Sequence, residues 1–257
     1  MNKENNPATP ENNQESIVAG RNAVTELLRS GREIECIYIQ QGELKGPLTV
    51  IAAKARQQGV PIKEVDSRKL DQLAPGHQGV AAIAAAWPYA QLEDILADAG
   101  EHPFLVLADQ IEDPHNLGAI IRTAEGAGAH GLIIPKRHSA GLTTGVAKAS
   151  AGAVEHLPVA RVSNLTATIQ LLKKRNIWVY CADMDGQPWC QTNFEGGVAL
   201  VVGSEGKGVS RIVRENCDGV VSLPMLGKMT SLNASVAAGV LLYEIARQRQ
   251  GIAARNP

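Results

Sequence analysis

The chain has 257 residues, of which 44% are hydrophobic and 20% are charged, and its formal net charge is −1. This is the composition of an ordinary globular protein with a substantial core, and it lacks the run of about 18 apolar residues that a membrane-spanning helix needs. The polar N-terminus predicts no signal peptide, and four dispersed cysteines favour a reduced, cytoplasmic protein. A net charge near zero excludes nucleic-acid binding through a global positive field, so an RNA partner would need a local basic patch.

The first 16 residues are rich in Asn, Pro and Glu and nearly devoid of apolar side chains. They cannot bury enough surface to offset the entropy of ordering and are predicted to form a disordered tail. Residues 17–86 alternate short helical and extended patterns, which predicts a small α/β/α domain. Its expected helices span residues 22–29, 48–58 and 67–73, and its expected strands span 34–39, 62–65 and 79–85.

Residues 87–101 are interpreted as a linker, because Trp87-Pro88-Tyr89 interrupts the last of these strands and a helix over 92–100 follows. Residues 102–257 then alternate strands and helices. The wholly apolar run Val198–Val202 is typical of a strand buried on both faces, which favours a parallel sheet covered by helices. The strands are expected at 104–108, 131–134, 177–182, 198–202 and 219–222, and the helices begin near residues 116, 143, 164, 210 and 233.

Two glycine-rich segments imitate nucleotide-binding motifs. Residues 126–131 match G-x-G-x-x-G by letter, but they follow a helix and precede a strand, which reverses the order of the dinucleotide fingerprint. We interpret them as a helix stop. The sequence GSEGKG at 203–208 resembles a phosphate loop but does not fit the register G-x-x-x-x-G-K-[ST]. The six histidines are dispersed without metal-ligand spacing, so no metal site is predicted.

Three loops at strand-to-helix junctions carry the functional signal. The first, DQIEDPHNLGAIIR, places Asn116 at an expected helix N-cap and Arg122 on the helix. The second is GSEGKG, with Glu205 among its glycines, and the third is MTSLNASV, in which Ser231 or Asn233 caps the terminal helix. Taken alone, each loop has an ordinary structural explanation: a solvated arginine for the first, a flexible turn for the second and a helix cap for the third. Together they indicate a ligand site that the backbone approaches closely, and therefore an enzyme.

The segments DQIEDPHNLGAIIRTAEGAGAHGLII, LVVGSEGKGVS and LPMLGKMTSLNASVAAGVLLYEIARQR resemble, in this order, the three motifs of the SpoU (TrmH-type) branch of the SPOUT methyltransferases. The similarity extends over residues 103–250. The front segments VAGRNAVTELL and HQGVAA resemble the substrate-binding domain fused to many members, which has the α/β/α fold of certain RNA-binding ribosomal proteins. Within the family, the chain is most similar to the bacterial 23S rRNA guanosine-2′-O-methyltransferases that act on the peptidyl-transferase P loop.

The resemblance implies an RNA ribose 2′-O-methyltransferase that depends on S-adenosylmethionine. It also implies that a deep trefoil knot closes the C-terminal parallel-sheet domain, which would be an exception to the rule that chains do not thread loops. The knot would pack the second and third motifs into the cofactor pocket. Backbone atoms near Gly203, Leu223 and Leu232 would hold the adenosyl group, and Met225 and Leu226 would line the pocket.

The implied catalytic residues are Arg122, Asn116, Glu205, Ser231 and Asn233. Arg122 matches the essential arginine of the family, which is often described as the general base. Because arginine is effectively always protonated in proteins, we expect it to bind the adjacent phosphate and to stabilise the developing alkoxide. Asn116 and Glu205 would position Arg122 and the ribose, and Ser231 and Asn233 would complete the pocket.

The resemblance further implies a homodimer in which the terminal helices pack together and Arg122 reaches the partner's site. Val236, Val240, Leu241 and Ile245 would form a suitable apolar face, although a helix buried in its own domain has the same pattern. RNA would contact a local rim of basic side chains. The candidates are Lys136, Arg137, His138, Lys148, Lys207, Arg211 and Arg214.

We expect rRNA to be the substrate. A tRNA ribose methyltransferase is the alternative with the same chemistry, and the front domain argues against it because many tRNA-directed relatives carry short terminal extensions instead. A catalytically silent RNA-binding or ribosome-assembly factor is an alternative of another class, and the intact set of motif residues argues against it. A nicotinamide enzyme is disfavoured by the misplaced G-x-G-x-x-G.

Overall fold

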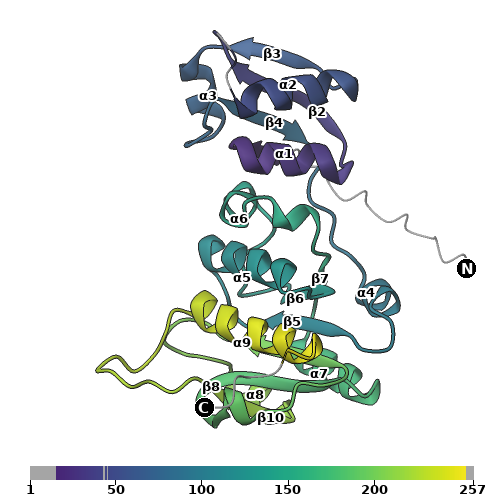
Figure 1. Ribbon diagram of the computed structural model, residues 1–257, viewed down its shortest axis with the longest axis vertical. Coiled ribbons are helices and arrows are strands. Elements are labelled where there is room, and N and C mark those ends of the chain that lie inside the picture. Colours follow the sequence, from purple (N-terminus) through teal and green to yellow (C-terminus); the bar gives the residue numbers. More distant parts are fainter. Residues whose placement is uncertain (1–15, 43, 45, 253–257) are drawn as a thin grey trace, which may run out of the picture.

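The computed structural model describes residues 16–42, 44 and 46–252 and contains two β-sheets, one in each of two units (Figure 1). The predicted α/β class is confirmed. Residues 1–15 of the predicted disordered tail lie outside the described residues, whereas Ser16 begins the first strand. In the part of the chain that is described, no helix has both the length and the apolar character needed to cross a bilayer.

The N-terminal unit is a four-stranded sheet with helices on both faces. Its elements are β1 (Ser16–Ala19), α1 (Arg21–Ser30), β2 (Ile34–Gln40), α2 (Pro47–Gln57), β3 (Ile62–Val65), α3 (Ser67–Leu73) and β4 (Val80–Ala84). The strand order is β1-β4-β2-β3, and β2 and β3 are parallel. Val18 and Ile37 pack in one cluster with α1 and α2, whereas Ala19 and Ala81 pack with Leu70 of α3. Side chains that alternate between the faces of a sheet require this division.

The C-terminal unit is a six-stranded parallel sheet in the order β10-β8-β9-β5-β6-β7. Its strands are β5 (Phe104–Ala108), β6 (Gly131–Pro135), β7 (Val159–Val162), β8 (Trp178–Pro188), β9 (Val198–Val202) and β10 (Gly219–Ser222). Its α-helices are α4 (Leu92–Asp98), α5 (Pro114–Gly126), α6 (Thr144–Ala149), α7 (Leu165–Lys174), α8 (Arg211–Asn216) and α9 (Ala234–Arg249). Two 3-10 turns, η1 (Ala153–Glu155) and η2 (Trp189–Gln191), complete the unit.

Helices cover both faces of this parallel sheet, because every residue of its central strands is apolar and buried. In β5, Phe104 and Val106 pack with α5 and α9, whereas Leu105 and Leu107 pack with α4, α7 and α8. All five residues of β5 and all five of β9 are buried. The continuous apolar runs in the sequence therefore identify the two strands at the middle of the sheet.

The structure corrects several predicted boundaries. Helix α5 begins at Pro114 and is capped by the Asp113 side chain, so Asn116 is not the cap and is free to contact other loops. Strand β7, which includes the exposed Arg161, was not predicted. Strand β8 continues past residue 182, where Gly186 lets β10 approach. A Cβ at Gly186 would lie 2.7 Å from the Val221 nitrogen.

The segment predicted as a linker is tied to the C-terminal unit. Trp87 is buried, and the Ala90 nitrogen donates a hydrogen bond of 2.9 Å to the Val159 carbonyl, which brings this segment to the edge of β7. Helix α4 then packs its Leu92 and Ile95 against the sheet. The chain between the two sheets is therefore held by packing rather than extended through solvent.

Candidate active site

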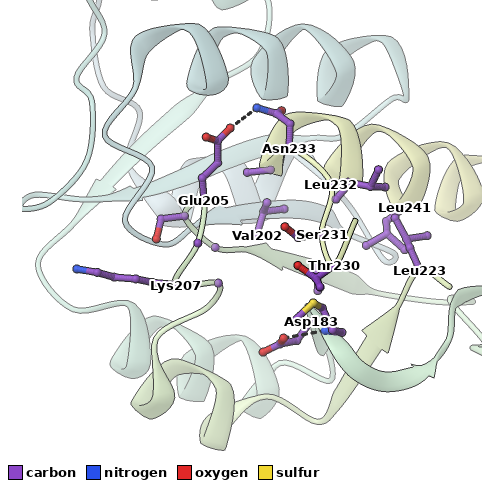
Figure 2. Close-up of a pocket in the computed structure, with 18 of the residues that line it drawn as sticks. Asp183, Val202, Glu205, Lys207, Leu223, Thr230, Ser231, Leu232, Asn233 and Leu241 are labelled. Carbon is purple, nitrogen blue, oxygen red and sulfur yellow. Dashed lines mark hydrogen bonds between the residues drawn. The ribbon is translucent and has the colours of Figure 1, made fainter. Parts of the chain in front are cut away.

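A cavity of about 740 Å³ opens where the chain leaves the carboxyl ends of β8, β9 and β10. Its lining comes from β8, from β9 and the loop after it, from β10 and from the chain that leads into α9, so it lies outside the ends of parallel strands, where sheets of this kind bind ligands. The cavity has the size typical of small-molecule sites. Its walls include the apolar side chains of Val202, Val221, Leu223 and Leu241, and its polar side chains include Asp183, Glu205 and Lys207 (Figure 2).

The loop after β9 forms one wall of the cavity and depends on its glycines. Ser204 and Gly208 exchange two backbone hydrogen bonds of 3.1 and 2.9 Å, which close the loop on itself. A Cβ at Gly203 would overlap the backbone of Gly208, and Gly206 and Gly208 adopt positive φ angles of 78° and 65°. Only glycine fits these positions without strain. The closed loop leaves the Glu205 side chain exposed at the mouth of the cavity.

Asn116, Glu205 and Asn233 meet at this mouth, one from each of the three sequence motifs. The Asn116 Nδ2 donates to the Glu205 Oε1 at 3.0 Å, and the Asn233 Nδ2 donates to the Asn116 Oδ1 at 3.0 Å. Asn233 also donates to Glu205, and Figure 2 shows these two side chains pointing toward one another. The Asn233 Oδ1 accepts from the Ser235 and Val236 nitrogens, so this residue caps α9 as predicted.

The other two predicted catalytic residues, Ser231 and Arg122, do not belong to this hydrogen-bonded group. Ser231 lines the cavity. Arg122 does not, because it lies six residues beyond Asn116 on α5, which turns its side chain by about 120° and moves it about 9 Å along the helix axis. Arg122 is exposed and forms no hydrogen bond or ion pair with any described residue. The structure therefore brings Asn116, Glu205 and Asn233 together and leaves Arg122 outside the group.

Most of the residues predicted to hold the cofactor also line the cavity. Gly203, Leu223, Met225 and Leu232 are all part of its wall. Leu226 is not, and it is 96% exposed. The resemblance implied that Leu226 lines the pocket together with Met225, whereas in the structure its side chain faces solvent in the irregular segment after β10.

The sequence analysis missed Asp183, which lines the cavity from the unpredicted extension of β8. Its Oδ2 accepts a hydrogen bond of 2.8 Å from the Arg214 Nη1, and Arg214 also donates to Asp185 at 2.7 Å. These hydrogen bonds lower the pKa of Asp185 and raise the pKa of Arg214. The available signal was the position of Asp183 directly after an apolar strand, where ligand-binding side chains commonly lie.

Four residues of the predicted basic rim have partners within the protein, among them His138, whose Nδ1 lies 3.4 Å from the Glu112 Oε1. Arg214 is held by the two aspartates, Arg211 pairs with Glu215 at 2.7 Å, and the Lys148 Nζ donates to the Pro75 carbonyl of the N-terminal unit at 3.1 Å. Lys207 lines the cavity. The rim is thus less cationic than the sequence indicates.

The parallel sheet and the cavity beyond the ends of β9 and β10 are the architecture of an α/β enzyme with a small-molecule site. The chain belongs to the SpoU rRNA Methylase family, whose model matches residues 103–243. The model of the RNA 2′-O ribose methyltransferase substrate-binding domain matches residues 17–90. The chain is therefore an RNA 2′-O-ribose methyltransferase of the SpoU/TrmH family, a class of enzymes that use S-adenosylmethionine as methyl donor.

Three known proteins illustrate the similarity. A Bacillus subtilis (strain 168) protein assigned to the TrmH family of tRNA/rRNA methyltransferases, YacO, is 49% identical over 245 residues, which cover 93% of this chain and 98% of that protein. The SpoU methyltransferase AviRb from Streptomyces viridochromogenes, solved with its cofactor AdoMet, is 29% identical with a TM-score of 0.78, covering 92% of this chain and 91% of AviRb. The A. aeolicus TrmH/SpoU tRNA modifying enzyme is 27% identical with a TM-score of 0.53, covering 62% of this chain and 84% of that one.

Proposed function

We propose that this enzyme methylates the ribose 2′-hydroxyl of a guanosine in 23S rRNA, in the cytoplasm, and that its active site is the cavity with the Asn116, Glu205 and Asn233 group. The observation that carries the site assignment is the meeting of these three side chains. Their motifs are far apart in the sequence, yet their polar atoms converge at the mouth of the cavity. The group lies at the exposed mouth of the cavity, and its mutual hydrogen bonds give the three side chains a defined orientation.

The residues of the cavity fit S-adenosylmethionine. Gly203, Leu223 and Leu232 supply backbone and apolar surface for the adenosyl group, and Met225 lies beside them. The carboxylates of Asp183 and Glu205 complement the positive charges of the ligand. When bound, S-adenosylmethionine supplies an electrophilic methyl group on its sulfonium. The protein contributes by binding the donor next to the ribose and holding the 2′-hydroxyl in line with the methyl group.

Arg122 acts in this proposal from the partner subunit of a homodimer. Its side chain is exposed and lies outside the cavity of its own chain, so a second copy can bring its own Arg122 to the Asn116, Glu205 and Asn233 group. There the guanidinium binds the phosphate next to the target nucleotide and stabilises the developing alkoxide, which suits a planar, permanently charged donor.

The exposed side of α9 supports the dimer. Val236, Val240 and Tyr243 recur at helical spacing, and all three are exposed apolar or aromatic side chains. Leu241 and Ile245, which the sequence analysis placed on the same face, are buried in their own unit. The proposed interface therefore uses only part of the predicted face. An exposed apolar stripe on a helix commonly marks a protein–protein contact.

An rRNA substrate is supported by the N-terminal unit. Residues 17–90 match a substrate-binding domain, whereas the tRNA-modifying neighbour covers only 62% of this chain. A tRNA ribose methyltransferase remains the alternative with the same chemistry. A catalytically silent RNA-binding factor is the alternative of another class, and the intact Asn116, Glu205 and Asn233 group argues against it.

Methyl transfer from labelled S-adenosylmethionine tests the proposal, using 23S rRNA without its ribose methyl groups beside bulk tRNA, with the modified nucleotide mapped. A single ribose-methylated guanosine in 23S rRNA supports the proposal. Label in tRNA alone overturns the substrate and keeps the chemistry. If neither RNA is labelled and the protein binds no S-adenosylmethionine in calorimetry, the silent RNA-binding factor becomes the better description.

A further inference from the structure

A buried ion pair joins the two units. Arg32 lies in the connection between α1 and β2 of the N-terminal unit, and its Nη1 donates to the Glu155 Oε1 of η1 in the C-terminal unit at 3.0 Å. The side chains of Arg32 and Glu155 are 8% and 3% exposed. Burial lowers the pKa of Arg32, and the nearby Glu155 opposes that effect. Charged side chains are rarely placed so far from water unless their partners fix them.

Trp87 completes this pair from the chain that connects the sheets. Its indole Nε1 donates to the same Glu155 Oε1 at 2.8 Å, and the Arg32 guanidinium lies 4.1 Å from the centre of its ring. The three side chains are therefore joined by a charge pair, a hydrogen bond and a cation–π contact. The Arg32 Nη2 also donates to the Ser16 Oγ at 3.2 Å, whereas the buried Arg32 Nε has no hydrogen-bond partner among the described residues. We call Arg32, Trp87 and Glu155 the interunit cluster.

Further contacts surround the interunit cluster. His156 lies 2.8 Å from the Glu26 carboxylate of α1, and Lys148 of α6 donates to the Pro75 carbonyl. Gly152 packs so closely on α1 that a Cβ there would lie 2.6 Å from the Glu26 Cβ. One buried apolar cluster also runs through both units without interruption. The contact is thus broad, and the charged side chains at its centre are buried.

The segment from α6 to η1 also packs against α5, the helix that carries Asn116 and Arg122. Helix α6 lies between α1 and α5 (Figure 1). A Cβ at Gly118 of α5 would lie 2.8 Å from the Val146 carbonyl oxygen and 2.9 Å from the Ser150 nitrogen. The segment from α6 to η1 therefore touches the N-terminal unit on one side and the motif-bearing helix on the other.

We propose that Arg32, Trp87 and Glu155 are positioning residues that fix the substrate-binding unit rigidly on the methyltransferase unit, so that RNA held by the first is presented to the active site of the second. This inference rests on the proposed function in one respect, namely that the N-terminal unit holds RNA. A buried ion pair often adds little net stability, because desolvation offsets its Coulomb attraction, and in some proteins such pairs fix a unique geometry. Methyl transfer needs such geometry, because a shift of about 1 Å in a bound substrate costs about 10²-fold in rate.

Interunit distances test the rigidity without reference to activity. Spin labels are placed on the full chain at V50C in α2 and I212C in α8, two exposed positions in different units. The exposed Cys190 is replaced by serine so that it is not labelled. Labelled protein is diluted with unlabelled protein so that only distances within one chain are measured. Pulsed electron paramagnetic resonance measures the distance between the two labels, and it is expected to give one narrow distance distribution when the interunit cluster is wild type. E155A leaves Arg32 buried without its partner and is expected to broaden the distribution. E155Q keeps an acceptor oxygen for Trp87 and is expected to broaden it less.

Kinetics test the positioning role. We expect E155A to lower kcat/KM for the RNA substrate by at least about tenfold, and to leave the Kd for S-adenosylmethionine within about twofold of wild type, since Glu155 lies outside the cavity. The matched control is K173M, which breaks the 2.8 Å pair of Lys173 and Asp218 elsewhere in the C-terminal unit. It is expected to change neither the distances nor kcat/KM. R32M provides a second test of the same contact if E155A does not fold.

The proposal of a rigid interface would be overturned by either of two results. One is a narrow, unchanged interlabel distance in both E155A and R32M, and the other is a broad distance distribution in the wild type. Broad distances with unchanged RNA kinetics would overturn the positioning role. If the wild type methylates no RNA but its distances respond as expected, the proposed function fails and the rigid interface stands.

Discussion

The amide of Asn116 on α5 donates a hydrogen bond of 3.0 Å to the carboxylate of Glu205, a residue 89 positions later in the loop after β9. Asn233, from the third motif, donates to both. The two asparagines thereby fix the direction of the carboxylate at the mouth of the cavity.

Replacing Glu205 by glutamine removes the charge while keeping the shape of the side chain. We expect kcat/KM for RNA methylation to fall by about 10², because two amides lose their charged acceptor and the positions of Asn116 and Asn233 loosen. The matched control is E215Q, which changes an exposed glutamate that pairs with Arg211 on α8 and is expected to behave as wild type. Wild-type turnover in E205Q would contradict the assignment of Glu205 to the active site.

Mixing two inactive variants tests whether Arg122 acts across a dimer. R122A and E205A are each expected to lose methylation, and R122A is expected to retain S-adenosylmethionine binding because Arg122 does not line the cavity. A mixed dimer has one site with Glu205 from one chain and Arg122 from its partner. Activity should therefore return on mixing, as measured by methyl incorporation. If the mixture stays inactive although mixed dimers form, Arg122 does not act in the partner's site.

Placing a charge on the exposed stripe of α9 tests the dimer face. V240E should disrupt self-association in sedimentation velocity and abolish methylation together, because a buried unpaired carboxylate at an interface is strongly unfavourable. I212E is the control, since Ile212 is an equally apolar and exposed side chain on α8. It is expected to leave both properties unchanged. A V240E protein that remains a dimer would exclude this face as the interface.

The packing of α5 on α6 should not tolerate a methyl group at residue 118. A Cβ at Gly118 would lie 2.8 Å from the Val146 carbonyl oxygen, and overpacking of this kind costs about 1–3 kcal/mol. We therefore expect G118A to lower the free energy of unfolding in urea. At Gly145 of α6 the nearest atom would be 3.5 Å away, so G145A should be neutral or slightly stabilising. Equal stabilities of the two variants would show that the helices separate readily.

His130 should make stability depend on pH. Burial and the nearby Arg249 lower its pKa, and its Nδ1 accepts a hydrogen bond of 2.9 Å from the Phe104 nitrogen. The unfolded chain therefore binds a proton at a higher pH than the folded protein does. The stabilising contribution of neutral His130 to the free energy of unfolding is complete above the ordinary histidine pKa of about 6.5. It is lost as the pH falls through the lowered pKa of the folded protein. Urea unfolding from pH 7.5 to 5 should show a smaller loss for H130Q than for wild type. Parallel curves would contradict this role of His130.

The sequence by itself determined the local elements and the residues of the motifs. Apolar runs such as Val198–Val202 fixed the central strands, since a strand buried on both faces has no polar position. The glycines of the 203–208 loop indicated a close backbone approach, and the overlap of a Cβ at Gly203 with Gly208 explains why. The cap at Asn233 also followed from local hydrogen-bonding rules.

Only the tertiary structure decided which of these residues meet. Asn116, predicted as a cap, instead contacts Glu205 because Asp113 caps α5. Leu226 faces solvent, and Asp183 enters the cavity from an extension of β8 that local patterns do not reveal. Arg32 and Glu155 are 123 positions apart, and no motif of the sequence singles them out, yet their side chains form a buried pair between the units. Burial and pairing depend on contacts between residues distant in sequence, which no local pattern encodes.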